Sequence, residues 1–229
     1  MIVAEQKPLE EIKAMIAPYH NILVVGCGTC VTVCFAGGEK EVQILASSLR
    51  MASRIDGAPK QVAEAVVQRQ CEWEFLDTIK EQVGQYDAIL GLGCGVGAQA
   101  IAEHFATAFV LPGLNTSFLG LTMEAGVWAE RCAACGSCIL DKTGGICPIA
   151  RCSKSLLNGP CGGSLGGKCE IGKETDCAWD MIVKRMKERG QLEKLSDITP
   201  PKDWSTARDG GPRRISREDL MLAREGELP

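Results

Sequence analysis

Eight cysteines stand in a short stretch that is otherwise made mostly of glycine, proline and polar residues. A segment with so few aliphatic side chains cannot hold itself together by apolar burial, so the cysteines must supply the cross-links. Disulfides, zinc and iron-sulfur clusters are the three ways in which they can do so. The eight positions are Cys132, Cys135, Cys138, Cys147, Cys152, Cys161, Cys169 and Cys177.

The start of the chain argues against disulfides. It reads MIVAEQKPLEEIKAMI, with acidic residues where a secretory signal peptide has a basic start and an uninterrupted apolar core. We therefore expect a reducing, cytoplasmic location, where thiols at C-x2-C spacing bind metal. We expect no membrane segment, because no apolar run reaches spanning length. A net charge of -4 and a pI near 5.4 argue against a nucleic-acid partner.

The spacing of the eight cysteines favours iron-sulfur clusters over zinc. Cys132, Cys135 and Cys138 form a three-thiol run, and Cys147-Pro148 follows, which is similar to the bacterial ferredoxin run except for a longer last gap. A zinc site with four thiolates is usually built from two C-x2-C pairs. Neighbouring glycines leave backbone amides free to approach the sulfurs. We expect two 4Fe-4S clusters here, with one cluster plus one zinc ion as the alternative.

The part of the chain before these cysteines alternates between strand and helix patterns. Short, continuous apolar runs predict buried parallel strands, and segments with helical periodicity lie between them. This alternation predicts an α/β fold, a four-stranded parallel sheet with flanking helices. Residues 1–20 are expected to form one amphipathic helix. The expected strands are 21–26, 61–70, 86–93 and 107–113, and the expected helices that follow them are 41–55, 75–83 and 98–105.

Three domains follow from this pattern. Residues 1–125 are expected to form the α/β, Rossmann-like domain, which carries one cluster site. Residues 126–195 are expected to form a loop-rich, cysteine-rich metal domain that ends in a helix over 180–195. Residues 196–229 are rich in proline, glycine and mixed charge and are expected to form an extended tail, with one short helix capped by Ser216 and Asp219.

Five further cysteines follow the predicted strands of the α/β domain. Cys27, Cys30 and Cys34 come directly after the first strand, Cys71 after the second and Cys94 after the third. The carboxyl ends of parallel strands meet at one crevice, so these thiols are expected to be neighbours in space. We expect one 4Fe-4S cluster on Cys27, Cys30, Cys34 and Cys94, with Cys71 as a spare or as the fourth ligand. In the alternative interpretation, Cys71 and Cys94 are small buried apolar residues.

A second motif overlaps one of these cysteines. Gly93-x-Gly95-x-x-Ala98 follows a strand and opens a helix, as a dinucleotide-binding turn does. The variable position inside the turn is a cysteine, and no strand-ending acidic residue follows about 20 residues later to bind a ribose. A metal site is therefore favoured over a nucleotide site.

The chain resembles a known family in its cysteine-rich part. The segments CAACGSCILDKTGGICPIARCSKSLLNGPCGG, KCEI and CAW are similar to the C-terminal cysteine-rich domain of methylenetetrahydrofolate reductases. With GCGTCVTVC ahead of them, the whole chain resembles the separate small subunit, MetV type, of acetogenic and related anaerobic bacteria. The likeness spans roughly residues 15–195, and LLNGPCGG is its most specific part.

The resemblance implies a function in one-carbon metabolism, in the Wood-Ljungdahl pathway. It implies a complex with a flavin-containing TIM-barrel reductase subunit (MetF type), which reduces methylene-tetrahydrofolate to methyl-tetrahydrofolate. This chain would then be a non-catalytic subunit that brings electrons to that flavin from a donor such as ferredoxin or another iron-sulfur or flavin subunit. The family also allows zinc in the cysteine-rich domain.

The residues themselves are in keeping with an electron relay. No paired carboxylates, activated nucleophile, phosphate loop or flavin fingerprint stands out, so we expect no substrate site on this chain. Two to three 4Fe-4S clusters on one small chain can pass single electrons. The alternative is a zinc-stabilised assembly subunit of the same complex, in which the metal only holds the shape.

Overall fold

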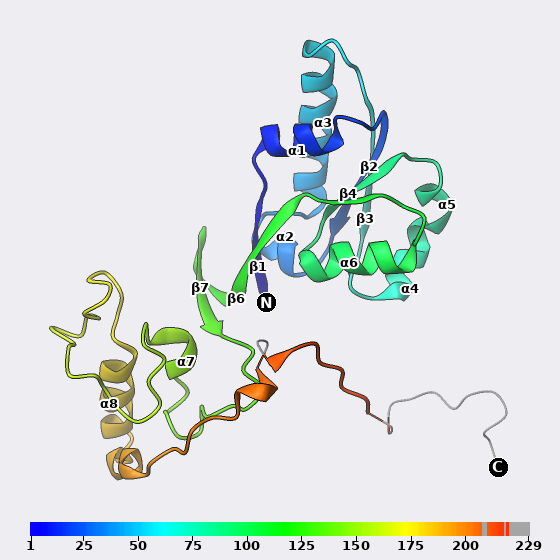
Figure 1. The fold of residues 1–229 in the computed structure, drawn as a ribbon. Coiled ribbons are helices and arrows are strands. Elements are labelled where there is room, and N and C mark those ends of the chain that lie inside the picture. Colours follow the sequence, from blue (N-terminus) through cyan, green and yellow to red (C-terminus); the bar gives the residue numbers. More distant parts are fainter. Residues whose placement is uncertain (208–209, 218, 220–229) are drawn as a thin grey trace, which may run out of the picture. The chain divides into compact units, whose positions relative to one another are not determined.

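The chain divides into two compact units, Met1–Arg131 and Cys132–Pro229. The structure is a computed structural model, and it describes residues 1–207, 210–217 and 219 (Figure 1). Within these residues, no helix combines the length and the apolar character that crossing a bilayer requires.

The first unit contains the expected parallel sheet. Its strands are β2 (Asn21–Cys27), β3 (Gln61–Val67), β4 (Ala88–Leu92) and β5 (Val110–Pro112), in the order β3-β2-β4-β5. All three neighbouring pairs run parallel. The two central strands, β2 and β4, are buried along almost their whole length. Their continuous apolar sequences are what a strand covered on both faces requires. The prediction of an α/β fold with a four-stranded parallel sheet is confirmed.

Helices cover both faces of this sheet (Figure 1). Ile22 and Val24 of β2 pack in one apolar core with the first two long helices. Leu23 and Val25, which point to the opposite face, pack in a second core with the helices that follow β3 and β4. The helices of the first core are α1 (Leu9–Ile16) and α3 (Glu39–Ile55), and those of the second are α4 (Trp73–Leu76), the 3-10 turn η1 (Asp77–Ile79), α5 (Lys80–Val83) and α6 (Gly95–His104).

The order of the strands makes the boundary between β2 and β4 the topological switch point of the sheet. The chain leaves β2 toward β3 on one side and later continues from β4 to β5 on the other side. The direction of winding therefore reverses between β2 and β4, and ligands of open α/β sheets bind outside the carboxyl ends of the strands at such a point.

A second, smaller sheet differs from what the sequence pattern predicts. The strands β1 (Ile2–Gln6), β6 (Leu114–Glu124) and β7 (Val127–Cys132) form it in the order β1-β6-β7. The expected single helix over residues 1–20 is wrong, because residues 2–6 pair antiparallel with β6 and only α1 is helical. The proline at position 8, which precedes the helix, separates the two elements. The partner strand lies more than a hundred residues away, so local periodicity could not reveal the pairing.

The second unit is mostly loops and turns. Its longest helix is α8 (Ala178–Glu188), so the helix expected over 180–195 begins earlier and ends sooner. Its apolar core contains Ile146, Trp179, Ile182 and Met186, far fewer residues than either core of the first unit. The short helix expected from Ser216 falls mainly outside the described residues. The remaining elements are α7 (Pro148–Arg151), η2 (Leu192–Ser196) and η3 (Trp204–Thr206).

Candidate metal centres

The first unit brings cysteines to the carboxyl ends of its strands. Cys27 is the last residue of β2, Cys30 is the first residue of the short helix α2 (Cys30–Val33), and Cys94 immediately precedes α6. Cys71 follows β3 and precedes α4. These four cysteines therefore lie at or shortly after the carboxyl ends of β2, β3 and β4, the edge at which open α/β sheets bind ligands.

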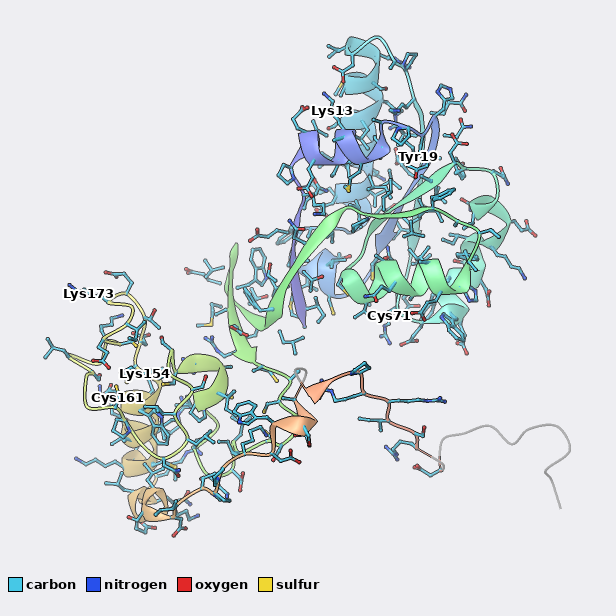
Figure 2. The ribbon with its side chains drawn as sticks, viewed as in Figure 1. Lys13, Tyr19, Cys71, Lys154, Cys161 and Lys173 are labelled. Carbon is cyan, nitrogen blue, oxygen red and sulfur yellow. The ribbon has the colours of Figure 1, made fainter. Side chains whose placement is uncertain are left out.

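The electrostatic surroundings of Cys71 include two of the other thiols. Partial burial raises the pKa of the exposed Cys71 thiol, and negative charge on Cys27 and on Cys94 raises it further. The guanidinium of Arg69 has a raised pKa, mainly because it bonds to Glu72, with smaller contributions from Cys71 and Cys30. We call Cys27, Cys30, Cys71 and Cys94 the strand-end set (Figure 2, where Cys71 is labelled).

Cys34 has different surroundings. Its side chain is buried in the apolar core that includes β1 and α3. Its thiol donates to the carbonyl oxygen of Ala4 at 3.5 Å and to that of Val31 at 3.7 Å. These contacts are those of a satisfied core cysteine.

The backbone of Cys27 is fixed on one side by the loop that follows α2 and on the other by a residue of α2 itself. Its N–H donates to the carbonyl oxygen of Gly37 at 2.9 Å, and its carbonyl oxygen accepts from the hydroxyl of Thr32 at 2.7 Å. The hydroxyl of Thr29 lies 3.4 Å from its sulfur. A Cβ on Gly37 would lie 1.9 Å from the carbonyl oxygen of Leu92, so glycine is needed for the close approach to β4. Sequence reasoning singled out neither threonine, although both stand within five residues of Cys27.

Glycines in and beside the nucleotide-like turn already make close contacts with the protein itself. A Cβ on Gly93 would lie 2.0 Å from Oε1 of Gln70, and one on Gly97 would lie 2.8 Å from the same atom. The N–H of Gly95, the first in α6, donates to the hydroxyl of Thr116 at 2.8 Å. The space and one of the N–H groups that a pyrophosphate would use are therefore occupied by the protein itself.

Four cysteines of the second unit line one cavity. They come from separate loops and from the residue before α8, and Trp179 closes the cavity from within the first turn of that helix. We call Cys152, Cys161, Cys169 and Cys177 the cavity set. Their separation along the sequence hides the grouping, which only the folding of the loops produces.

Hydrogen bonds to sulfur favour the thiolate form of one member of the cavity set, Cys169. The hydroxyl of Ser153 and the backbone N–H groups after Cys169 lower the pKa of the Cys169 thiol. The N–H of Gly163 donates to the sulfur of Cys161 at 3.4 Å. Such bonds stabilise negative charge on sulfur, as thiolate ligands of a cluster require. Ser153 is a further residue that sequence reasoning missed.

A charged pair borders the same cavity. Lys154 bonds to Glu170, whose carboxylate also accepts from the thiol of Cys161 at 3.3 Å (Lys154 and Cys161 are labelled in Figure 2). Lys154 and then Cys161 lower the pKa of Glu170, and Glu170 raises the pKa of Lys154. Both residues line the cavity with the thiols.

The remaining four cysteines form what we call the loop set, Cys132, Cys135, Cys138 and Cys147. The sulfur of Cys132 accepts from the N–H of Ala134 at 3.4 Å, and that of Cys147 accepts from the N–H of Ala150 at 3.4 Å at the start of α7. Ala134 and Gly136 have positive φ values of 50° and 78°, which turn the chain sharply between the first three thiols.

The described part of the chain contains no group of three or more His, Cys, Asp or Glu side chains arranged to hold a metal ion. A zinc ion binds its sulfurs at about 2.3 Å and so draws them together around one point. A 4Fe-4S cluster binds each thiolate to a different iron atom and keeps the sulfurs further apart. The donor chemistry of the thiol sets, with backbone N–H groups directed at sulfur, fits such a cluster.

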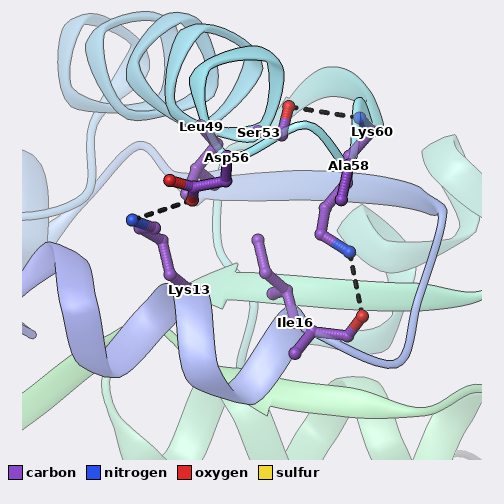
Figure 3. A pocket seen from close by; sticks show the side chains of 8 residues that line it. Lys13, Ile16, Leu49, Ser53, Asp56, Ala58 and Lys60 are labelled. Atoms are coloured by element: carbon purple, nitrogen blue, oxygen red, sulfur yellow. Dashed lines mark hydrogen bonds and ion pairs between the residues drawn. The ribbon is translucent and has the colours of Figure 1, made fainter.

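One cavity of the first unit has no part in this chemistry. It has a volume of about 160 Å³ and is lined by α1, the end of α3 and the segment before β3, at the amino ends of the strands (Figure 3). Lys13 pairs with Asp56 at 2.9 Å, and Nζ of Lys60 donates to the carbonyl oxygens of Ala17 and Tyr19. These interactions join α1 to α3 and to the start of β3, so the cavity is part of the packing of the unit.

Comparison with known proteins relates part of the chain to one family. No curated protein and no solved structure matches the chain significantly. Residues 111–205, which include the loop set and the cavity set, match a family model described as "Methylene-tetrahydrofolate reductase C terminal", and this region is thereby related to the methylenetetrahydrofolate reductases.

Proposed function

We propose that this chain is the iron-sulfur electron-transfer subunit, MetV type, of a cytoplasmic methylenetetrahydrofolate reductase. In this proposal it delivers electrons to the flavin of a TIM-barrel partner subunit, which reduces methylene- to methyl-tetrahydrofolate. The observation that carries it is the cavity set, because four cysteines from separate loops line one cavity inside the region related to the reductases.

Twelve of the thirteen cysteines divide into three sets of four in this proposal. The strand-end set, the loop set and the cavity set would each hold one 4Fe-4S cluster, which when bound supplies one-electron transfer at potentials between about -700 and +450 mV. Cys71 replaces Cys34 in the strand-end set, because the charges of Cys27 and Cys94 act on Cys71 whereas the thiol of Cys34 bonds into the core.

Hydrogen-bond donors of the protein lie against sulfurs of the loop set and the cavity set, where they would stabilise negative charge. The N–H groups of Ala134, Ala150 and Gly163 donate to cysteine sulfurs of the loop set and the cavity set, and the hydroxyl of Ser153 bonds to the sulfur of Cys169. Each such bond stabilises a deprotonated sulfur, and bonds to sulfur also set the potential of a cluster.

The metal content of the chain tests the proposal. Purified without oxygen and assayed for iron, sulfide and zinc, it is expected to contain about eight to twelve iron atoms per chain with matching sulfide. Zinc without iron would contradict electron transfer and support the alternative, a zinc-stabilised assembly subunit.

The direction of electron flow needs a second measurement. With a low-potential donor such as ferredoxin, the flavin of the partner subunit is expected to be reduced only when this chain is present. Turnover of a folate by this chain alone, without any flavoprotein, would contradict its assignment as a non-catalytic subunit.

A further inference from the structure

Gln70 is a fully buried polar residue beside the strand-end set, with 0% of its surface exposed. Its Nε2 donates to the carbonyl oxygen of Val25 in β2 at 2.8 Å. Its Oε1 is buried and has no hydrogen-bond partner among the described residues. An amide oxygen left unpaired inside a protein is unfavourable, so its own hydrogen bonding does not explain why this side chain lies here.

The chain leaves space for Gln70 with two glycines. A Cβ on Gly93 would lie 2.0 Å from its Oε1, and a Cβ on Gly97 would lie 2.9 Å from its Cβ. Neither glycine is among those with positive φ, so space and not backbone conformation calls for glycine at both positions. The two glycines stand on either side of Cys94 and the start of α6.

Gln70 therefore contacts the three segments that carry most of the strand-end set. It directly precedes Cys71, it bonds to the residue two positions before Cys27, and it packs on the residue directly before Cys94. We propose that Gln70 is a positioning residue that fixes the spacing of the Cys27, Cys71 and Cys94 thiols so that they take a 4Fe-4S cluster. This inference rests on the proposed function.

Two variants test this role without altering a thiol. Gln70→Met keeps an unbranched side chain of similar length but has no amide, so it fills the same space without the bond to Val25. Gly97→Ala keeps the amide of Gln70 but adds a methyl group within 3 Å of its side chain, so Gln70 must shift, while alanine itself favours α6, in which position 97 lies. The matched controls are Gln99→Met and Gly84→Ala. Gln99 is exposed and donates to the carbonyl oxygen of Gly95, and a Cβ on Gly84 would meet nothing within 4 Å.

The full chain, purified without oxygen, is compared by its iron and sulfide content, by the EPR spectrum of its reduced form and by thermal unfolding. Gln70→Met is expected to lose about four iron atoms per chain and the matching sulfide while the first unit still unfolds cooperatively. Gly97→Ala is expected to change the EPR spectrum of the reduced chain. Both controls are expected to match the wild type in all three measurements.

Wild-type iron content together with a wild-type EPR spectrum in both variants would overturn the role of Gln70 and leave the proposed function standing. A wild-type chain without iron would instead overturn the proposed function itself. If Gln70→Met fails to fold, Gly97→Ala decides, and an unchanged EPR spectrum in that variant overturns the inference.

Discussion

At the scale of single residues, the cysteines of the first unit differ in what their sulfurs contact. Cys71 is exposed, and electrostatic interaction with Cys27 and Cys94 helps to raise the pKa of its thiol. Cys34 is buried and donates to a backbone carbonyl oxygen. The sequence places both after strands, and its C-x2-C-x3-C spacing favours Cys34 as a ligand and leaves Cys71 as a spare or as the fourth ligand.

Replacing each of the two cysteines by serine separates their roles. Cys71→Ser is expected to lose about four iron atoms per chain, because the strand-end set then lacks one thiolate. Cys34→Ser is expected to keep its iron, because a serine hydroxyl can also donate to Ala4. Iron and sulfide assays on oxygen-free preparations check both. Loss of iron from Cys34→Ser alone would show that the set is Cys27, Cys30, Cys34 and Cys94.

The carboxylate of Asp87, which directly precedes β4, bonds to the backbone at the start of β2. Oδ2 of Asp87 accepts from the N–H groups of His20 and Asn21, at 2.8 Å each. These bonds, that from Asn21 first, lower the pKa of Asp87 below its ordinary value of 3.8. Because the folded pKa is the lower one, the stability that the charge contributes is fully present above pH 3.8 and is lost as the pH falls through the folded pKa.

Asp87→Asn keeps an oxygen acceptor but removes the charge. The free energy of unfolding of the wild type is therefore expected to exceed that of the variant at pH 5 to 6, and the difference is expected to vanish in more acidic solution. Denaturant unfolding at a series of pH values measures this. A difference that stays constant with pH would mean that the charge of Asp87 makes no contribution.

At the scale of elements, the loop after α2 packs closely against the carboxyl end of β4. The backbone of Gly37 lies against the carbonyl oxygen of Leu92, and Gly37 also accepts from the N–H of Cys27. The partner of an added Cβ at position 37 would be a backbone atom of β4, so the clash could not be relieved by a change of rotamer.

Gly37→Ala is accordingly expected to lower the free energy of unfolding by about 1–3 kcal/mol, the usual result of overpacking. Gly84→Ala is the control, because its added methyl group would meet nothing and its φ of -70° suits alanine. It is expected to leave the stability unchanged or raise it by up to about 1 kcal/mol. Denaturant unfolding compares the two, and equal effects would refute the close contact.

At the scale of the whole molecule, the two units differ in what holds them together. The first unit has two apolar cores on the faces of its sheet, whereas the second has one small core and eight cysteines. Apolar burial suffices for the first unit, whereas under the proposed function the second unit depends on the clusters that its thiols would hold.

Removal of metal by a chelator is therefore expected to unfold the second unit and spare the first. Structural metal contributes about 10 kcal/mol or more to the folding of zinc-finger-like domains, and a comparable loss exceeds what the small core supplies. Limited proteolysis followed by mass spectrometry is expected to find cuts after Arg131, with residues 1–131 protected. Equal protection of both units, as in the metal-loaded chain, would mean that burial alone holds the second unit.

The sequence by itself determined the central strands of the parallel sheet, because buried strands need continuous apolar runs, and those of β2 and β4 are each closed by a glycine, Gly26 and Gly93. It also indicated that cysteines would follow the strands at one edge of the sheet, since carboxyl ends of parallel strands meet there. The pairing of β1 with β6, the contacts of Gln70 with Gly93 and Gly97, and the gathering of the cavity set were decided only by the tertiary structure. Each of these joins segments far apart in the chain, and local periodicity and spacing cannot predict contacts between distant segments.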